Sequence, residues 1–442
     1  MRFRVFFTFV LSLLLASAHA DTIEITGQVT VLDGMMPSSI YVAPYDRSAP
    51  ESNATISGNV FTIKVDVAKA AQYTLFLTYA PYDIMLAPAD KKVKVSVSIS
   101  AGQIRSIKVE NARENDAYMA FAEQVKAHDE LLRKQFVDCD KEEACGKEIH
   151  ALLVSYKADL DAIVSKYKGT YTTDVLCGMK MPAIAADNNQ TAAEFRAGYF
   201  RKVVFSDPTI LKTSVYKEMI DAYADFLIDP TLRGQQAFIT NLMASAKANP
   251  AVLRKTAEHL YEALVKKGRE KMLAAFIKWY GDNKEVVSNK GLDIKIGAMS
   301  KVMPGQPYID ISRPDVTGAE RSLKEIVGKS VCTLVMFWSP GCSHCTEEMP
   351  YIKEMYEKYH AKGFDIYGYC VDRDEELWKP YIADKQLKWT NVINGETEWK
   401  PMMDYVVETT PTLVLIDKKG VIIHRFAAKS KLDKYIEEVL NK

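Results

Sequence analysis

Residues 337–345 read Phe-Trp-Ser-Pro-Gly-Cys-Ser-His-Cys, and this stretch decides the fold of the C-terminal part of the chain. The apolar residues before it are typical of a buried strand, and the amphipathic stretch after it is typical of a helix. One helical turn returns Cys345 beside Cys342, so a reversible disulfide can close. Cys342 would lie at the helix N-terminus, where unpaired backbone N–H groups and the helix dipole stabilise a thiolate. The spacing therefore indicates a redox pair.

Half of a zinc site has the same cysteine spacing and is the alternative interpretation. A zinc site needs a second ligand pair, and the remaining cysteines contain no second Cys-x-x-Cys. We therefore favour redox chemistry and expect neither a metal nor an organic cofactor. Cys332 and Cys370 lie in apolar strand-like runs and are interpreted as buried core residues. Cys139 and Cys145 flank a charged turn, and either a structural bridge or two free thiols on helix ends fits them.

The N-terminus has the three regions of a secretory signal peptide. A charged start precedes an apolar core at residues 5–15, and Ala18-His19-Ala20 supplies small residues for a cleavage site. The sequence predicts cleavage near Ala20 and a periplasmic or secreted protein that begins at Asp21. Later apolar runs are too short to cross a bilayer, so we expect no membrane insertion.

The hydrophobic periodicity changes twice along the 442 residues, a length that exceeds a single core. Alternating apolar residues such as Phe61 and Ile63 predict an antiparallel β-sandwich domain at 21–110 after the signal peptide at 1–20. Helical spacing, with a capping Asn249 before a proline, predicts a helical domain at 111–290. The 57 basic and 57 acidic side chains balance, so no net charge attracts nucleic acid or an anionic membrane surface.

The last domain, at 291–442, alternates strands and helices beyond a linker expected near residues 297–300. This order predicts an α/β fold with a mixed sheet and helices on both faces. A turn, Asp417-Lys418-Lys419-Gly420, joins the last two strands as a hairpin. The expected strands lie at 308–311, 333–338, 364–371, 412–416 and 421–426, and the expected helices at 346–361, 375–384 and 431–440.

The stretch 337–345 resembles thioredoxin-fold proteins of the TlpA/ResA type, together with Glu348-Met349-Pro350 and a later Thr410-Pro411 before an apolar run. The resemblance covers the chain from about residue 304 onward and implies a thioredoxin-like domain. It implies that Cys342 attacks disulfides and that Cys345 resolves the mixed disulfide. It also implies a cis bond before Pro411, with Thr410, Pro411 and Trp338 contacting substrate. An ordinary trans proline that starts a strand is the alternative for Pro411.

Two further side chains follow from the same resemblance. His344 would direct hydrogen bonds or positive charge toward the Cys342 sulfur, or it is an exposed loop residue. Glu348 would exchange a proton with Cys345 if buried, or it is a helix-face charge if exposed. The chain departs from thioredoxin at Met336, which replaces a buried aspartate, and at Gly341, which replaces a tryptophan. These losses argue against a general thioredoxin.

The leading hypothesis is an exported thiol-disulfide oxidoreductase, with a reductase or isomerase favoured and an oxidant retained. Its partners would be cysteine-containing exported proteins and a redox partner protein. One alternative is a non-enzymatic binding or scaffold protein, because the upstream regions show no visible chemistry. The other is a thiol peroxidase, whose Pro-x-x-x-Thr-x-x-Cys loop is not provided by Pro340-Gly341-Cys342.

Overall fold

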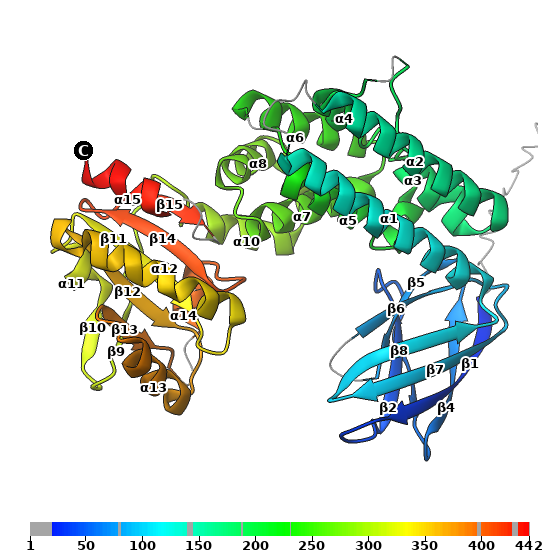
Figure 1. Ribbon diagram of the computed structural model, residues 1–442, viewed down its shortest axis with the longest axis horizontal. Coiled ribbons are helices and arrows are strands. Elements are labelled where there is room, and N and C mark those ends of the chain that lie inside the picture. The colour runs from blue at the N-terminus through cyan, green and yellow to red at the C-terminus, as the bar shows by residue number, and fades with distance from the viewer. Residues whose placement is uncertain are drawn as a thin grey trace, which may run out of the picture. The chain divides into compact units, whose positions relative to one another are not determined.

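A computed structural model describes residues 20–77, 81–138, 145–186, 189–229, 231–395, 399–426 and 432–441. A β-rich region, a helical region and an α/β region follow one another along the chain, as predicted (Figure 1). The chain divides into two compact units, one of residues 1–204 and 209–215, the other of residues 205–208 and 216–442. The helical region contributes to both units. The predicted signal peptide lies outside the described residues, apart from Ala20.

The β-rich region consists of two four-stranded sheets, in the orders β4-β1-β7-β8 and β3-β2-β5-β6. Alternate residues of β4 are buried, as the sequence predicted, and Phe61 and Ile63 belong to the shared core. One pairing corrects the antiparallel prediction, because β1 and β7 run parallel. Parallel neighbours need a long crossover, and the chain from β2 to β6 provides it. The strands are β1 (Asp21–Val31), β2 (Ser39–Pro44), β3 (Ser52–Thr55), β4 (Val60–Val67), β5 (Ala71–Phe76), β6 (Pro81–Leu86), β7 (Lys92–Ser100) and β8 (Gln103–Glu110).

The first part of the helical region belongs to the first unit. Its buried Lys180 is paired with Asp129 at 3.1 Å, which compensates the charge that burial would otherwise leave isolated. Cys145 is disulfide-bonded, and Cys139, with which one of the two alternatives pairs it, lies outside the described residues. The helices are α1 (Arg113–Asp138), α2 (Gly146–Lys166), α3 (Cys177–Lys180) and α4 (Ala192–Gly198), with a π-helical turn at Thr172–Leu176 and a 3-10 turn at Pro208–Lys212.

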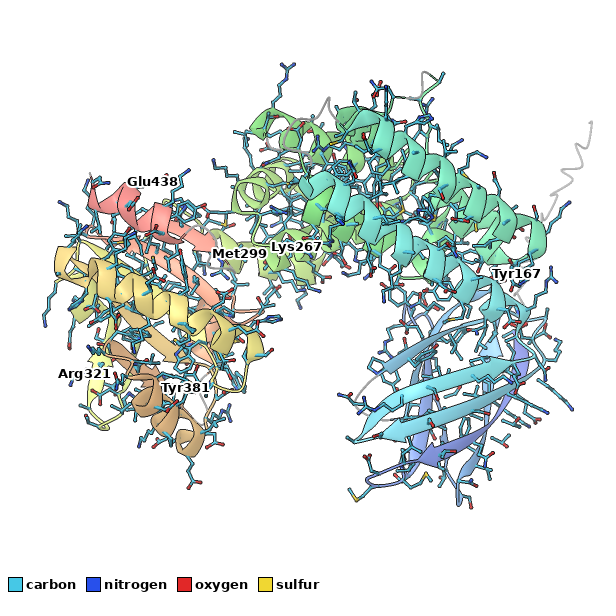
Figure 2. All side chains as sticks on the ribbon, in the orientation of Figure 1. Tyr167, Lys267, Met299, Arg321, Tyr381 and Glu438 are labelled. Atoms are coloured by element: carbon cyan, nitrogen blue, oxygen red, sulfur yellow. The ribbon has the colours of Figure 1, made fainter. Side chains whose placement is uncertain are left out.

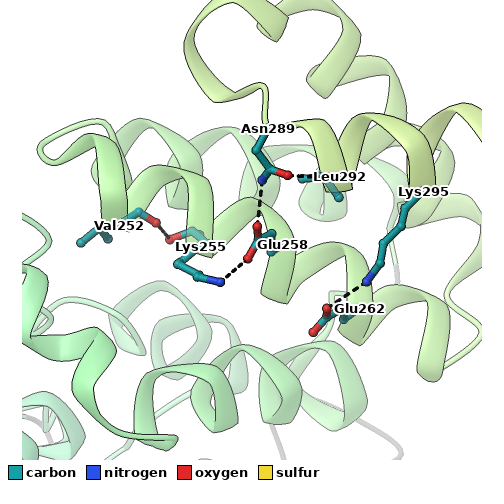
Figure 3. A network of polar contacts seen from close by, with 8 residues as sticks. Val252, Lys255, Glu258, Glu262, Asn289, Leu292 and Lys295 are labelled. Carbon is teal, nitrogen blue, oxygen red and sulfur yellow. Dashed lines mark hydrogen bonds and ion pairs between the residues drawn. The ribbon is translucent and has the colours of Figure 1, made fainter. Parts of the chain in front are cut away.

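The second part of the helical region packs in the second unit. Asn249 caps α7, as predicted, because its side chain accepts hydrogen bonds from the N–H groups of Ala251 and Val252. Glu258 of α7 accepts a hydrogen bond from Asn289, the cap of α10, at 2.8 Å (Figure 3). The helices are α5 (Val215–Ala222), α6 (Leu232–Ala246), α7 (Pro250–Lys266), α8 (Glu270–Asp282), α9 (Lys284–Val287) and α10 (Lys290–Ser300), with a π-helical turn at Tyr223–Leu227.

The prediction of a linker near residues 297–300 is wrong. These residues form the last turn of α10, and Leu292, Ile296 and Met299 are buried at the spacing of one helix face. The glycine at 297 is tolerated within the helix, although it suggested a break in the sequence.

The α/β region contains a five-stranded mixed sheet in the order β13-β12-β11-β14-β15. Strands β11, β12 and β13 are parallel, whereas β14 runs antiparallel to β11 and pairs with β15 through the predicted hairpin at residues 417–420. The strand expected at 308–311 is irregular, and β9 begins only at Ser312. The strands are β9 (Ser312–Pro314), β10 (Glu320–Ser322), β11 (Cys332–Trp338), β12 (Phe364–Cys370), β13 (Thr390–Ile393), β14 (Thr412–Asp417) and β15 (Ile422–Phe426). The helices are α11 (Leu323–Val327), α12 (Ser343–Tyr359), α13 (Glu375–Lys385), α14 (Lys400–Asp404) and α15 (Leu432–Leu440), with a 3-10 turn at His360–Lys362.

Both faces of β11 are covered, so all seven of its residues are buried. Leu334, Met336 and Trp338 face a core that α12, α13 and α15 complete. On the other face, the Phe337 ring lies 5.3 Å from that of Tyr369 and 5.1 Å from that of Tyr405. This packing fixes the end of β11, from which the Cys-x-x-Cys loop leaves (Figure 1).

Candidate active site

Cys342 lies between the buried strand β11 and helix α12. It is the residue just before α12, with an extended backbone of φ −91° and ψ 116°. Its carbonyl accepts the N–H of Thr346 at 3.0 Å, the first hydrogen bond of the helix. The sulfur therefore lies at the helix end where N–H groups lack intrahelical partners.

Thr410 is the second component of the site. The register of β14 against β11 pairs Thr412 with Phe337, so the residues just before Thr412 meet the loop that follows β11. The Cys342 Sγ donates a hydrogen bond to the Thr410 carbonyl over 3.4 Å. The bond between Thr410 and Pro411 is cis, as predicted.

The environment of Cys342 favours its thiolate. Partial burial alone would raise the pKa of Cys342. Hydrogen bonds from the Thr410 side chain, from the N–H and thiol of Cys345 and from the N–H of His344 outweigh that burial and lower the pKa below the usual 9.0. Because the thiolate is the nucleophilic form, Cys342 is the thiol prepared for attack.

Cys345 has the opposite environment. Its side chain is 2% exposed and belongs to the core beneath α12. Burial raises the pKa of Cys345 to about 12, and the neighbouring Cys342 adds to the increase. Both cysteines are free thiols in this structure. One sulfur is thus accessible and acidic, and the other is protected and remains protonated.

His344 and Glu348 differ in burial. The His344 side chain is exposed, and its contribution to the Cys342 sulfur comes from its backbone N–H. Glu348 is partly buried on α12, with its Oε2 atom shielded from solvent. It follows Cys345 by three residues, so both side chains lie on one side of the helix. The burial of Glu348 is therefore intermediate between the two alternatives that the sequence left open, a buried proton carrier and an exposed charge on the helix face.

The C-terminal domain is similar to known proteins. The Redoxin family matches residues 303–440. The thiol-disulfide oxidoreductase ResA of Bacillus cereus is 33% identical over 128 residues, which cover 28% of this chain and 72% of the relative. The chain belongs to the TlpA/ResA-type thiol-disulfide oxidoreductases. It is therefore an oxidoreductase with a thioredoxin-like domain.

Two solved structures are similar to parts of this family member. The thioredoxin domain of a thiol-disulfide oxidoreductase from Bacteroides vulgatus is 32% identical, with 31% of this chain and 98% of that chain covered and a TM-score of 0.30. A thioredoxin-like protein from Bacteroides caccae is 16% identical, with 58% of this chain and 97% of that chain covered and a TM-score of 0.44.

Trp338 does not fit the substrate-contact role that the sequence suggested for this TlpA/ResA-type protein. Its side chain is 0% exposed, and its ring lies 5.5 Å from that of Tyr381, which is labelled in Figure 2. The last residue of β11 points into the core under α12, so a docked polypeptide cannot contact it. Among the predicted site residues, the structure brings Cys342, Cys345 and Thr410 into direct contact.

Sequence reasoning missed a pair of residues that shapes the active-site loop of this oxidoreductase. The Ser339 hydroxyl donates to Asp372 at 2.5 Å and accepts the N–H of Gly341 at 3.0 Å. Ser339 follows β11 and Asp372 follows the parallel strand β12, and the carboxyl ends of parallel strands lie at one edge of the sheet. The sequence does place a polar residue after each of these two apolar runs. That Ser339 and Asp372 contact each other can be predicted only once the order of the strands in the sheet is known.

The structure also shows where Cys332 and Cys370 lie and bears on metal binding and membrane spanning. Cys332 and Cys370 are buried core residues, as predicted, and burial raises the pKa of each thiol to about 12. Within the described ranges, no three side chains of the metal-binding types gather into a potential metal site. In the same ranges, no helix combines the length and apolar character needed to span a membrane.

Proposed function

We propose that this protein is an exported thiol-disulfide oxidoreductase that exchanges its Cys342/Cys345 dithiol with cysteines of other exported proteins. The observation that carries the proposal is the opposite environment of the two sulfurs. Cys342 is partly exposed with a lowered pKa, and Cys345 is buried with a pKa of about 12. Two-step exchange requires such a pair, because one thiol must attack first and the other must wait.

The reaction proceeds through a mixed disulfide. The Cys342 thiolate attacks one sulfur of a substrate disulfide, and the other substrate sulfur leaves as a thiolate. Cys345 then loses its proton and attacks the Cys342 sulfur, which releases the second substrate thiolate. The protein dithiol is oxidised by two electrons, and the substrate disulfide is reduced to two thiols. Glu348, one helical turn after Cys345, is the proposed proton acceptor in the second step.

Thr410 and Pro411 form the proposed docking edge for the substrate polypeptide. The Thr410 carbonyl lies 3.4 Å from the Cys342 sulfur. An extended polypeptide that pairs with the backbone beside Thr410 would bring its own cysteine near Cys342. Main-chain pairing is tolerant of sequence, so this edge suits a range of cysteine-containing proteins, including a redox partner protein.

The favoured direction is reduction or isomerisation. A strong oxidant such as DsbA has a reduced form that is strongly stabilised and a potential near roughly −120 mV. At Cys342, partial burial opposes the hydrogen bonds that stabilise the thiolate. We expect equilibration with glutathione to give a potential between roughly −180 and −270 mV, the range from disulfide isomerase to thioredoxin. A potential near that of DsbA would reverse the proposed direction.

Export is proposed from the N-terminal sequence alone. We expect the mature protein to begin at Asp21 and to be recovered from the periplasm or the medium. N-terminal sequencing of the protein isolated from those fractions checks this. A chain that retains residues 1–20 and remains in the cytosol contradicts export without affecting the dithiol chemistry.

Mixed-disulfide trapping tests the exchange directly. In Cys345→Ala, the second step is blocked, so Cys342 should remain bonded to its substrate and the adduct should disappear on reduction. The double variant Cys342→Ala/Cys345→Ala is the matched control and should trap nothing. If both variants give the same adducts, or neither gives any, the proposed exchange is wrong.

A further inference from the structure

The helical region contacts the α/β region of the same unit through Glu270, the first residue of α8. Its carboxylate accepts the backbone N–H of Arg425 on β15 at 3.2 Å. The same oxygen lies 3.6 Å from Nδ1 of His424. Glu270 therefore holds β15 from outside the thioredoxin-like domain.

The Arg425 side chain continues this connection toward the active site. Arg425 is 8% exposed, and its Nη2 donates to the Val406 carbonyl at 2.7 Å. Val406 has a φ of 48°, a left-handed conformation that is strained for a β-branched residue. Such a conformation persists only when its surroundings hold it, and the Arg425 hydrogen bond is one such contact. Four residues later, Thr410 meets the Cys342 sulfur.

A small cavity lies beside the hydrogen bond from Arg425 to Val406. The cavity has a volume of about 30 Å³ and is lined by Arg425, Val406, Thr409 and Met299, the last labelled in Figure 2. The Nη1 atom of Arg425 is buried and finds no hydrogen-bond partner among the described residues. On this side the loop is held by the polar contact from Arg425, while Tyr405 packs against Phe337 on the other side.

We propose that Glu270 and Arg425 are positioning residues of the thiol-disulfide reaction, through which the helical region holds the loop of residues 405–411 that presents Thr410 to Cys342. The inference rests on the proposed dithiol chemistry and assigns the helical region a part in it. Loosening this loop removes the Thr410 side-chain hydrogen bond that stabilises the Cys342 thiolate. The reactivity of Cys342 then depends on a residue of α8.

The test compares Glu270→Ala and Arg425→Met in the full chain, with the Cys342 pKa measured from the pH dependence of alkylation. Both variants should raise the pKa by about one unit, roughly a tenfold loss of thiolate near neutral pH. At a pH above both Cys342 pKa values, the reduction potential of the Cys342/Cys345 pair should become more negative by about 30 mV, the same factor of ten for a two-electron couple. Because both act on one loop, the double variant should show no larger shift than either single variant.

The direction in which the Cys342 pKa changes in Glu270→Ala separates a positioning effect from a direct electrostatic effect. Removing a negative charge lowers a thiol pKa by Coulomb's law, whereas loosening the loop raises it. Glu270→Gln keeps an oxygen acceptor for the Arg425 N–H and should not raise the pKa. Arg321→Met, which removes an exposed ion pair with Asp315, should leave the Cys342 pKa unchanged.

An unchanged or lowered Cys342 pKa in Glu270→Ala overturns the proposal, as does a lower melting temperature with unchanged pKa and potential. If Arg425→Met does not fold, Glu270→Ala still decides, because Glu270 lies in a partly exposed position. The alkylation assay needs no protein substrate. A wild-type protein that fails to exchange disulfides therefore refutes the proposed function, while the pKa comparison separately decides the role of Glu270.

Discussion

Replacing Thr410 by valine removes the hydroxyl group beside the attacking sulfur and preserves the shape of the side chain. The backbone carbonyl that accepts the Cys342 thiol at 3.4 Å is retained. The Thr410 side chain lowers the Cys342 pKa through a hydrogen bond. We therefore expect the pKa of Cys342 to rise in Thr410→Val.

The size of the change follows from the environment of the sulfur. Hydrogen bonds to charged groups contribute about 1.5–3 kcal/mol. Cys342 is partly exposed, so the lower limit applies. At about 1.4 kcal/mol per pKa unit, the expected rise is about one unit. Stabilising the thiolate stabilises the reduced form, so at a pH above both Cys342 pKa values its loss should also make the reduction potential more negative by about 30 mV.

The assay is the rate of alkylation of Cys342 as a function of pH, together with equilibration against glutathione. At a pH below both pKa values, Cys342 of Thr410→Val should be alkylated about tenfold more slowly than Cys342 of the wild type. At a pH well above both pKa values, the two alkylation rates should converge. Thr410→Ser keeps a hydroxyl and should remain close to the wild type. If Thr410→Val and Thr410→Ser have the same pKa, the hydroxyl does not stabilise the thiolate and the reasoning fails.

Three further perturbations have defined outcomes. Trp338→Phe should lower the free energy of unfolding by about 1–3 kcal/mol because of the buried volume lost, with KM for a protein substrate unchanged; a raised KM would restore a docking role. Ser339→Ala should cost about 1–3 kcal/mol in a denaturant titration, because Asp372 loses its donor; unchanged stability would show that solvent replaces it. Glu348→Gln should slow the attack by Cys345 and prolong the mixed disulfide in single-turnover experiments, and an unchanged lifetime would assign the proton to another base.

The sequence predicted the location of the dithiol because strand, loop and helix are local features. An apolar run, a Pro-Gly pair and an amphipathic stretch each have a recognisable period or turn residue. The alternation at Phe61 and Ile63 predicted a half-buried strand for the same reason. The cap at Asn249 was also local, because its acceptor and donors lie within three residues.

Other features depend on which elements become neighbours. The parallel pairing of β1 with β7 requires knowledge that β2, β3, β5 and β6 form the second sheet. The family resemblance assigned Trp338 to substrate contact. The alternation of β11 instead turns its side chain into the core under α12. Ser339 and Asp372 are 33 positions apart and meet only because β11 and β12 are adjacent and parallel.

The opposite environments of the two sulfurs have one structural origin. Cys342 precedes α12, where N–H groups are unpaired and solvent is near, whereas Cys345 lies one turn later, on the face that packs against the core. The position before the helix therefore stabilises a thiolate, and the position one turn later is buried. In the proposed exchange a substrate sulfur approaches Cys342, whereas the buried Cys345 reaches only the Cys342 sulfur of the mixed disulfide. The proposed order of attack follows from the position of the helix start, which in turn is fixed by the packing of β11.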